Sequence, residues 1–115
     1  MYATLHYTNS QNKHEESQGS KEVAEITFHD AYHVFSVDWD HEKITFLLDN
    51  TKVNEVPITA DMKEFLRSFY LILNVAVGGN WPGDQDETTV FPQSFMLTMC
   101  AYLKKKDMMH PKRQS

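Results

Sequence analysis

Three acidic side chains at alternate positions, Asp38, Asp40 and Glu42, are the first candidates for acid–base chemistry in this chain. Alternate residues of a strand project from one face, so this spacing could gather carboxylates for general acid, general base or nucleophilic roles. Residues 40–43 are typical of a turn, however, and a chain reversal there would break the shared face. We expect solvated turn carboxylates, with a catalytic set as the alternative. The acidic residues of loop 78–90 have the same interpretation.

Histidine and acidic side chains that could bind a metal form a second set, scattered over two segments. They are His14, Glu15, Glu16, His29, Asp30 and His33. Compact zinc signatures hold their ligands at short, regular spacings, and these residues match none of them. Half of the set falls in a polar segment that we expect to be a loop. The sequence therefore predicts no metal site and no cofactor.

Strands and turns must position these side chains, and the apolar pattern predicts mostly strands. Residues 32–39 alternate strictly, and Trp39 is expected to pack in the core. Asp49-Asn50 is typical of a hairpin turn. The continuously apolar run 69–77 predicts a buried strand. The remaining expected elements are strands 2–8, 23–28, 44–48, 51–56 and 95–103, a polar loop over 9–21, and a short helix or turn over 59–68. This pattern predicts an all-β antiparallel sandwich or barrel.

Composition limits the classes of partner. The chain has 115 residues and a formal net charge of −5, which suits one small domain and argues against nucleic acid as a partner. Its basic residues cluster in a C-terminal tail, 104–115, which we expect to be frayed. Run 69–77 is far shorter than the roughly 20 residues that span a bilayer, so no membrane partner is expected. Cys100 is the single cysteine, which excludes an intrachain disulfide and suggests a buried, inert thiol.

Four stretches together resemble the family 16 glycoside hydrolases, especially the laminarinase-like endo-β-1,3-glucanases. They are residues 3–7, residues 32–39 running into 42–46, residues 69–83, and residues 91–94. Their order and spacing match the C-terminal half of that family, and the run 71–83 is the most specific of them. The resemblance implies an antiparallel β-sandwich of the jelly-roll (concanavalin-like) type, incomplete in this chain, as a domain over 1–103 followed by the tail 104–115.

The resemblance also implies which chemistry to expect. Retaining glycosidases use two carboxyl groups about 5–5.5 Å apart. The family carries them in a Glu-x-Asp-x-x-Glu strand upstream of the segment that matches residues 3–7, so we expect this chain to lack that strand and its catalytic residues. Many members bind a structural calcium through an aspartate in the last strand, where this chain has Thr98. Members are mostly secreted. No signal peptide is visible here, which leaves the localisation open.

Four residues remain as candidates for binding β-glucan. Asn74 matches a family position that contacts sugar, although a protein partner would satisfy a buried amide equally well. Trp81, beside Asn80 in a Gly/Pro loop, is suited to stack on a sugar ring, with capping of the sandwich edge as the alternative. His6 matches a histidine beside the family's active site, with a structural role as the alternative.

Three hypotheses follow for the function. The first is a fragment of a β-glucan-hydrolysing enzyme that is inactive alone, and the second is a non-catalytic β-glucan-binding module. The third is an assembly role, because an incomplete jelly roll exposes strand edges and an apolar sheet face. A homodimer or a strand-exchanged assembly would cover them.

Overall fold

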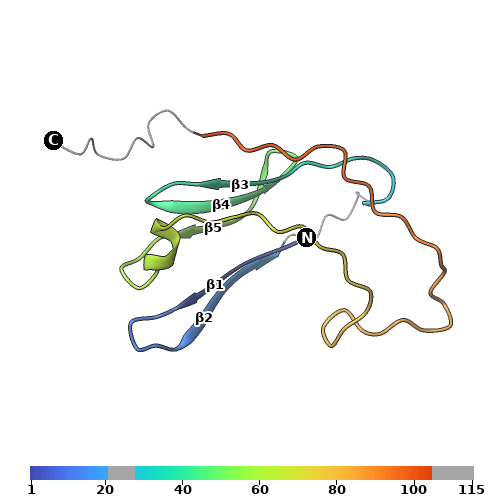
Figure 1. Cartoon of the computed structure of the whole chain (residues 1–115), viewed down its shortest axis with the longest axis horizontal. Coiled ribbons are helices and arrows are strands. Elements are labelled where there is room, and N and C mark those ends of the chain that lie inside the picture. The colour runs from blue at the N-terminus through green and yellow to red at the C-terminus, as the bar shows by residue number, and fades with distance from the viewer. Residues whose placement is uncertain (21–27, 105–115) are drawn as a thin grey trace. The chain divides into compact units, whose positions relative to one another are not determined.

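A computed structural model describes residues 1–20 and 28–104, and the chain divides into two compact units, Met1–Phe69 and Tyr70–Ser115. Unit 1 contains a two-stranded sheet and a three-stranded sheet, both antiparallel (Figure 1). Among the described residues, the helical content is one short 3-10 helix, η1, Lys63–Leu66. The predicted all-β antiparallel fold class is therefore confirmed.

The two-stranded sheet is a hairpin of β1, Tyr2–Thr8, and β2, His14–Ser20. The polar loop predicted over 9–21 is therefore wrong over 14–20. The turn is held by Asn9, whose Oδ1 accepts the N–H groups of Gln11 and Lys13, both at 2.9 Å, and Asn12 adopts a φ of 60°. Pairing with β1 satisfies the backbone of β2, so this strand forms without the apolar alternation on which sequence reasoning depends.

The three-stranded sheet has the order β3-β4-β5, with β3 at Phe35–Trp39, β4 at Lys43–Leu48 and β5 at Thr51–Pro57. Leu48 pairs with Thr51 across a two-residue turn. Its residues Asp49 and Asn50 have φ values of 48° and 65°, the backbone of a type I′ hairpin turn. The hairpin predicted at Asp49-Asn50 is confirmed.

A small apolar core joins the two sheets of unit 1. It consists of buried side chains from β1, β4, β5 and the segment around η1: Leu5, Ile44, Val56, Met62 and Phe65. Trp39 packs against this core, as predicted, and its ring meets that of Phe69 edge-on at 5.3 Å. The side-chain amide of Asn54 on β5 donates to the carbonyl oxygen of Ala3 at 3.2 Å, so a polar contact also ties β1 to β5.

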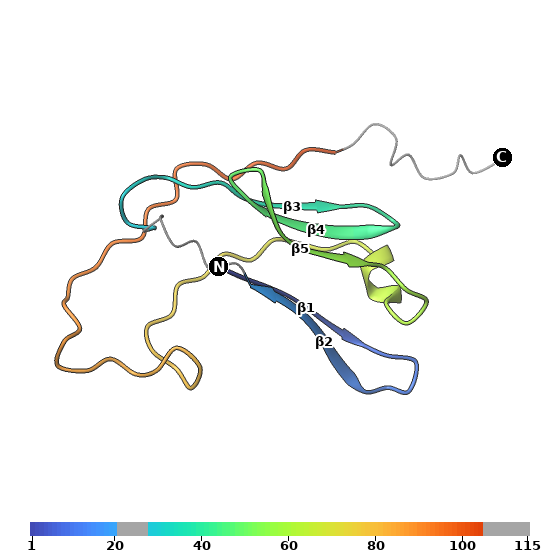
Figure 2. The same ribbon diagram turned by 180° about the vertical axis from the view of Figure 1, so that it is seen from behind.

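Unit 2 has no regular strand or helix over its described residues, 70–104 (Figure 2). The strand predicted over 69–77 is therefore wrong in this structure, and its apolar side chains are exposed: Leu71, Ile72, Leu73, Val75 and Val77. The strand predicted over 95–103 is wrong as well, and Cys100 is exposed instead of buried. A strand forms only where a neighbour pairs with its backbone, and apolar composition does not specify that neighbour.

Two expected features fall wholly or largely outside the described residues. The strand predicted over 23–28 does so except for Phe28, and the basic tail does so from residue 105 onward. Within residues 1–20 and 28–104, no helix is long and apolar enough to cross a membrane.

Candidate functional site

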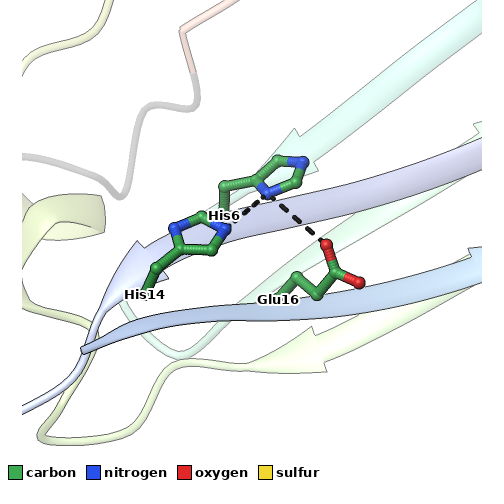
Figure 3. A group of neighbouring side chains, drawn as sticks. All are labelled: His6, His14 and Glu16. Atoms are coloured by element: carbon green, nitrogen blue, oxygen red, sulfur yellow. Dashed lines mark hydrogen bonds and ion pairs between the residues drawn. The ribbon is translucent and has the colours of Figure 1, made fainter. Parts of the chain in front are cut away.

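His6, one of the residues selected from the sequence, forms a cluster with His14 and Glu16 (Figure 3). The register explains the cluster, because His6 pairs directly with Glu16 and Thr8 pairs with His14. His14 and Glu16 are two residues apart on β2, so both project from the face that carries His6. His6 Nδ1 lies 3.2 Å from His14 Nε2 and 3.8 Å from Glu16 Oε2, and the two imidazole rings stack with centroids 5.2 Å apart.

Sequence reasoning selected His6 and named His14 and Glu16 as possible metal ligands, but it did not foresee that the three meet. It placed His14 and Glu16 in a polar loop, where their spacing had no geometric meaning. The signal that could have found them is the pair Asn9 and Asn12, because asparagine readily closes turns and tolerates a positive φ. A hairpin centred on these residues brings residues 14–16 opposite residues 6–8.

The other three predicted binding residues, Asn74, Asn80 and Trp81, belong to unit 2. Asn74 is exposed, so the premise that it is an amide buried in an apolar strand is wrong. Asn80 and Trp81 lie in a turn, as expected, and the Trp81 side chain is 71% exposed. An exposed indole in a turn is the kind of side chain on which sugar rings stack.

Two acidic residues considered for a catalytic set, Asp40 and Asp86, accept hydrogen bonds from nearby backbone N–H groups instead. Strand β3 ends at Trp39 and β4 begins at Lys43, so residues 40–42 form the connection, as predicted. Asp40 Oδ1 accepts the N–H groups of Glu42 at 2.8 Å and Lys43 at 2.9 Å. In unit 2, the hydroxyl and N–H of Thr88 both donate to Asp86 Oδ1 and lower the pKa of that carboxyl. Both aspartates therefore have a structural use.

The scattered histidines beyond β2 pair with nearby carboxylates. His29 Nε2 lies 3.0 Å from Asp30 Oδ1. His33 Nδ1 lies 2.7 Å from Asp49 Oδ2, and this contact lowers the pKa of Asp49, as does the hydrogen bond from the N–H of Val34. The six candidate metal ligands named from the sequence therefore do not form one group in the described structure.

An open depression of about 490 Å³ lies in unit 1 between the end of β1 and η1. It is lined by polar side chains together with Ala60, and none of the four predicted glucan-binding residues lines it. Two of the lining residues are joined by a hydrogen bond: the N–H of Thr8 donates to Glu64 Oε1 at 2.8 Å, and this bond lowers the pKa of that carboxyl. Its lining contains no aromatic side chain, the kind of surface on which sugar rings stack.

Comparison with known proteins gives one family and two relatives. The family model described as Glycosyl hydrolases family 16 matches residues 2–96. The Clotting factor G alpha subunit of Tachypleus tridentatus is 30% identical over 69 residues, which cover 57% of this chain and 10% of that protein. The Beta-glucanase of Rhodothermus marinus is 35% identical over 72 residues, which cover 56% of this chain and 24% of that protein. The chain thus spans a quarter or less of the length of these relatives, and no solved structure matches it.

Proposed function

From the finding that the chain belongs to glycosyl hydrolases family 16, we propose that it is a fragment of a β-glucan-hydrolysing enzyme. The match over residues 2–96 is the observation that carries the proposal, and it confirms the resemblance inferred from the sequence. The similarity to a beta-glucanase supports β-glucan as the ligand. The same match supports one jelly-roll domain over 1–103 followed by the tail.

We further propose that these 115 residues bind β-glucan without hydrolysing it. Retention of configuration requires one carboxyl as nucleophile and another as acid/base, about 5–5.5 Å apart. The alternating set at Asp38, Asp40 and Glu42 is divided between β3 and a turn, which supports the absence of such a pair from this segment. Reducing-sugar release from laminarin by the pure chain would contradict this part of the proposal.

Glucan contacts are proposed for Trp81, Asn80 and Asn74 of unit 2 and, separately, for His6 of unit 1, with Trp81 contributing most. If a sugar ring stacked on the exposed indole gains the about 0.5–1.5 kcal/mol that pairs of aromatic rings gain beyond burial, Trp81→Ala should weaken binding of laminarin oligomers by about threefold to tenfold. Tyr102→Ala removes another exposed aromatic side chain from unit 2 and is the matched control, which should leave the affinity unchanged. Calorimetry that detects no binding, or equal affinities for both variants, would sink the assignment.

A non-catalytic β-glucan-binding module is the alternative, and it predicts the same binding without hydrolysis. The DNA upstream of the codon for Met1 separates the two. An in-frame Glu-x-Asp-x-x-Glu segment supports the enzyme fragment, and an in-frame jelly-roll half without paired carboxylates supports the binding module.

Self-association is proposed as a property of the chain in either case. The observation that favours it is the exposure of the run 69–77, which lies in unit 2 except for Phe69: the side chain of Leu71 is 71% exposed and that of Val75 is 65% exposed. Contiguous apolar surface of this kind is typical of a surface that contacts another molecule. A second copy carries the same run and could cover it by isologous pairing, since the strand propensity of this run is high.

A further inference from the structure

We propose that the β1–β2 hairpin binds a divalent transition-metal ion, Zn²⁺ in the first instance, through His6, His14 and Glu16 (Figure 3). The proposal rests on the hairpin alone and is independent of any role in glucan binding. Sequence spacing gave no zinc signature because two of the three ligands come from a strand opposite the first, and antiparallel register brings them together.

The distances suit one ion. Two ligand atoms that each lie about 2.0–2.1 Å from a tetrahedral zinc ion are about 3.3–3.4 Å apart. His6 Nδ1 and His14 Nε2 are 3.2 Å apart, which is close to that separation. Glu16 Oε2 is 3.8 Å from His6 Nδ1, and all three ligand atoms lie within 4.8 Å of one another. The Glu16 carboxylate would have to move closer to the imidazoles, and the 60% exposure of its side chain allows that movement.

The donor set selects the kind of ion. Two imidazoles and one carboxylate are a borderline set that suits Zn²⁺, whereas Ca²⁺ and Mg²⁺ require sites built mainly from oxygen. With three protein ligands, a four-coordinate zinc ion keeps one position for water or an exogenous ligand. Without an ion, the contact between His6 Nδ1 and His14 Nε2 is a hydrogen bond, for which one of these nitrogens must carry the proton. A bound ion would instead accept the lone pairs of both nitrogens.

The hairpin holds these ligands in place before the ion binds. Asn9 closes the turn through the N–H groups of Gln11 and Lys13. At the other end, Asn54 donates to the carbonyl oxygen of Ala3 and ties the hairpin to β5. The ligand side chains are exposed, so the ion can enter without any opening of the core.

Titration calorimetry with ZnCl₂ on the full chain tests the proposal. The expected result is one zinc ion per chain, with affinity reduced at least tenfold in His14→Ala and in Glu16→Gln. His41→Ala is the matched control, because His41 is also exposed and also lies beside a glutamate, Glu42, yet should leave zinc binding unchanged. Each titration is repeated on Cys100→Ser, since an exposed thiol also binds zinc. Absence of zinc binding, or full affinity in His14→Ala, would overturn the proposal.

A second measurement covers the case in which a variant does not fold. Zinc added to the unaltered chain should shift the ring resonances of His6 and His14 and leave those of His29 and His41 in place. The melting temperature should rise with zinc and fall back after chelation, because an ion that binds only the folded state stabilises it. Shifts confined to histidines outside the hairpin would contradict the site.

Discussion

Two carboxylates of unit 1, Asp49 and Glu55, hold neighbouring strands together through hydrogen bonds. Their contacts are expected to make the stability of unit 1 depend on pH. Asp49 closes the type I′ turn and also reaches back to the start of β3, where Oδ1 accepts the N–H of Val34 at 2.8 Å and Oδ2 meets His33 Nδ1 at 2.7 Å. On the β4–β5 pair, Glu55 accepts hydrogen bonds from Lys43 and Thr45. These contacts lower the pKa of both carboxyls. The largest cause is the hydrogen bond with His33 for Asp49, and the hydrogen bond from Lys43 for Glu55.

The Asp49 contacts predict a loss of stability in acid. A carboxyl with a pKa lowered by folding contributes stability above its ordinary value of 3.8, and that contribution is lost as the pH falls through the folded pKa. Asp49→Asn should therefore be less stable than the unaltered chain at pH 6, and the difference should shrink between pH 4 and pH 2. Urea melts across this range measure it, with the exposed Asp61→Asn as control. A difference that stays constant with pH would contradict the role of the charge.

For single residues, the sequence predicts hydrogen bonds between near neighbours in the chain better than contacts between residues on paired strands. Residues 40–43 were predicted as a turn, because an Asp side chain readily accepts hydrogen bonds from nearby backbone N–H groups. Asp40 does so, although Lys43 already belongs to β4. The contact between His6 and His14 depends on a register that no run of neighbouring residues encodes. The binding roles of Asn74, Asn80 and Trp81 remain predictions.

Elements were predictable where a turn signal lay between two strand-prone segments. The Asp49-Asn50 turn lies between segments 44–48 and 51–56, and the structure has β4 and β5 there. Strand β2 has the turn signal at Asn9 but almost no apolar residue, so the pattern argued against it. Residues 69–77 have the apolar pattern but no strand in the described structure, because pairing needs a neighbour that the run cannot specify.

The packing of the hairpin against β5 depends on the absence of a side chain at Gly19. A Cβ placed there would lie 2.5 Å from both Cβ and Cγ of Asn54. Gly19→Ala should cost about 1–3 kcal/mol, the usual penalty for overpacking, and chemical denaturation would measure it.

A double-mutant cycle identifies the cause of that cost. Asn54→Gly removes both clashing atoms along with the amide that binds Ala3. If the clash is the cause, the double variant should be less destabilised than the sum of the single variants. Simple additivity would instead indicate that Gly19 is needed for a reason unrelated to Asn54.

At the scale of the whole molecule, the two units differ in how far their apolar side chains are buried. Unit 1 buries a core of apolar residues around Leu5, Ile44 and Phe65, although others such as Phe35 and Val37 are exposed. The described residues of unit 2 leave their large apolar side chains exposed. Hydropathy along the sequence predicted burial in both units and could not tell them apart, since burial depends on a covering surface. Family membership gives the jelly-roll sheet as the setting in which such a run is normally covered.

The exposed run should therefore make the chain associate with itself. Each buried leucine or valine contributes about 1.5–3 kcal/mol, and a two-fold interface counts each residue twice. Sedimentation velocity should then show a concentration-dependent species larger than the 13.4 kDa monomer. Leu73→Lys should weaken that association at least about tenfold, because it would place a charge in the apolar contact. Gln85→Lys adds the same charge at an exposed polar position of unit 2 and should leave it intact. A monomer at every concentration would show that a second copy does not cover this run.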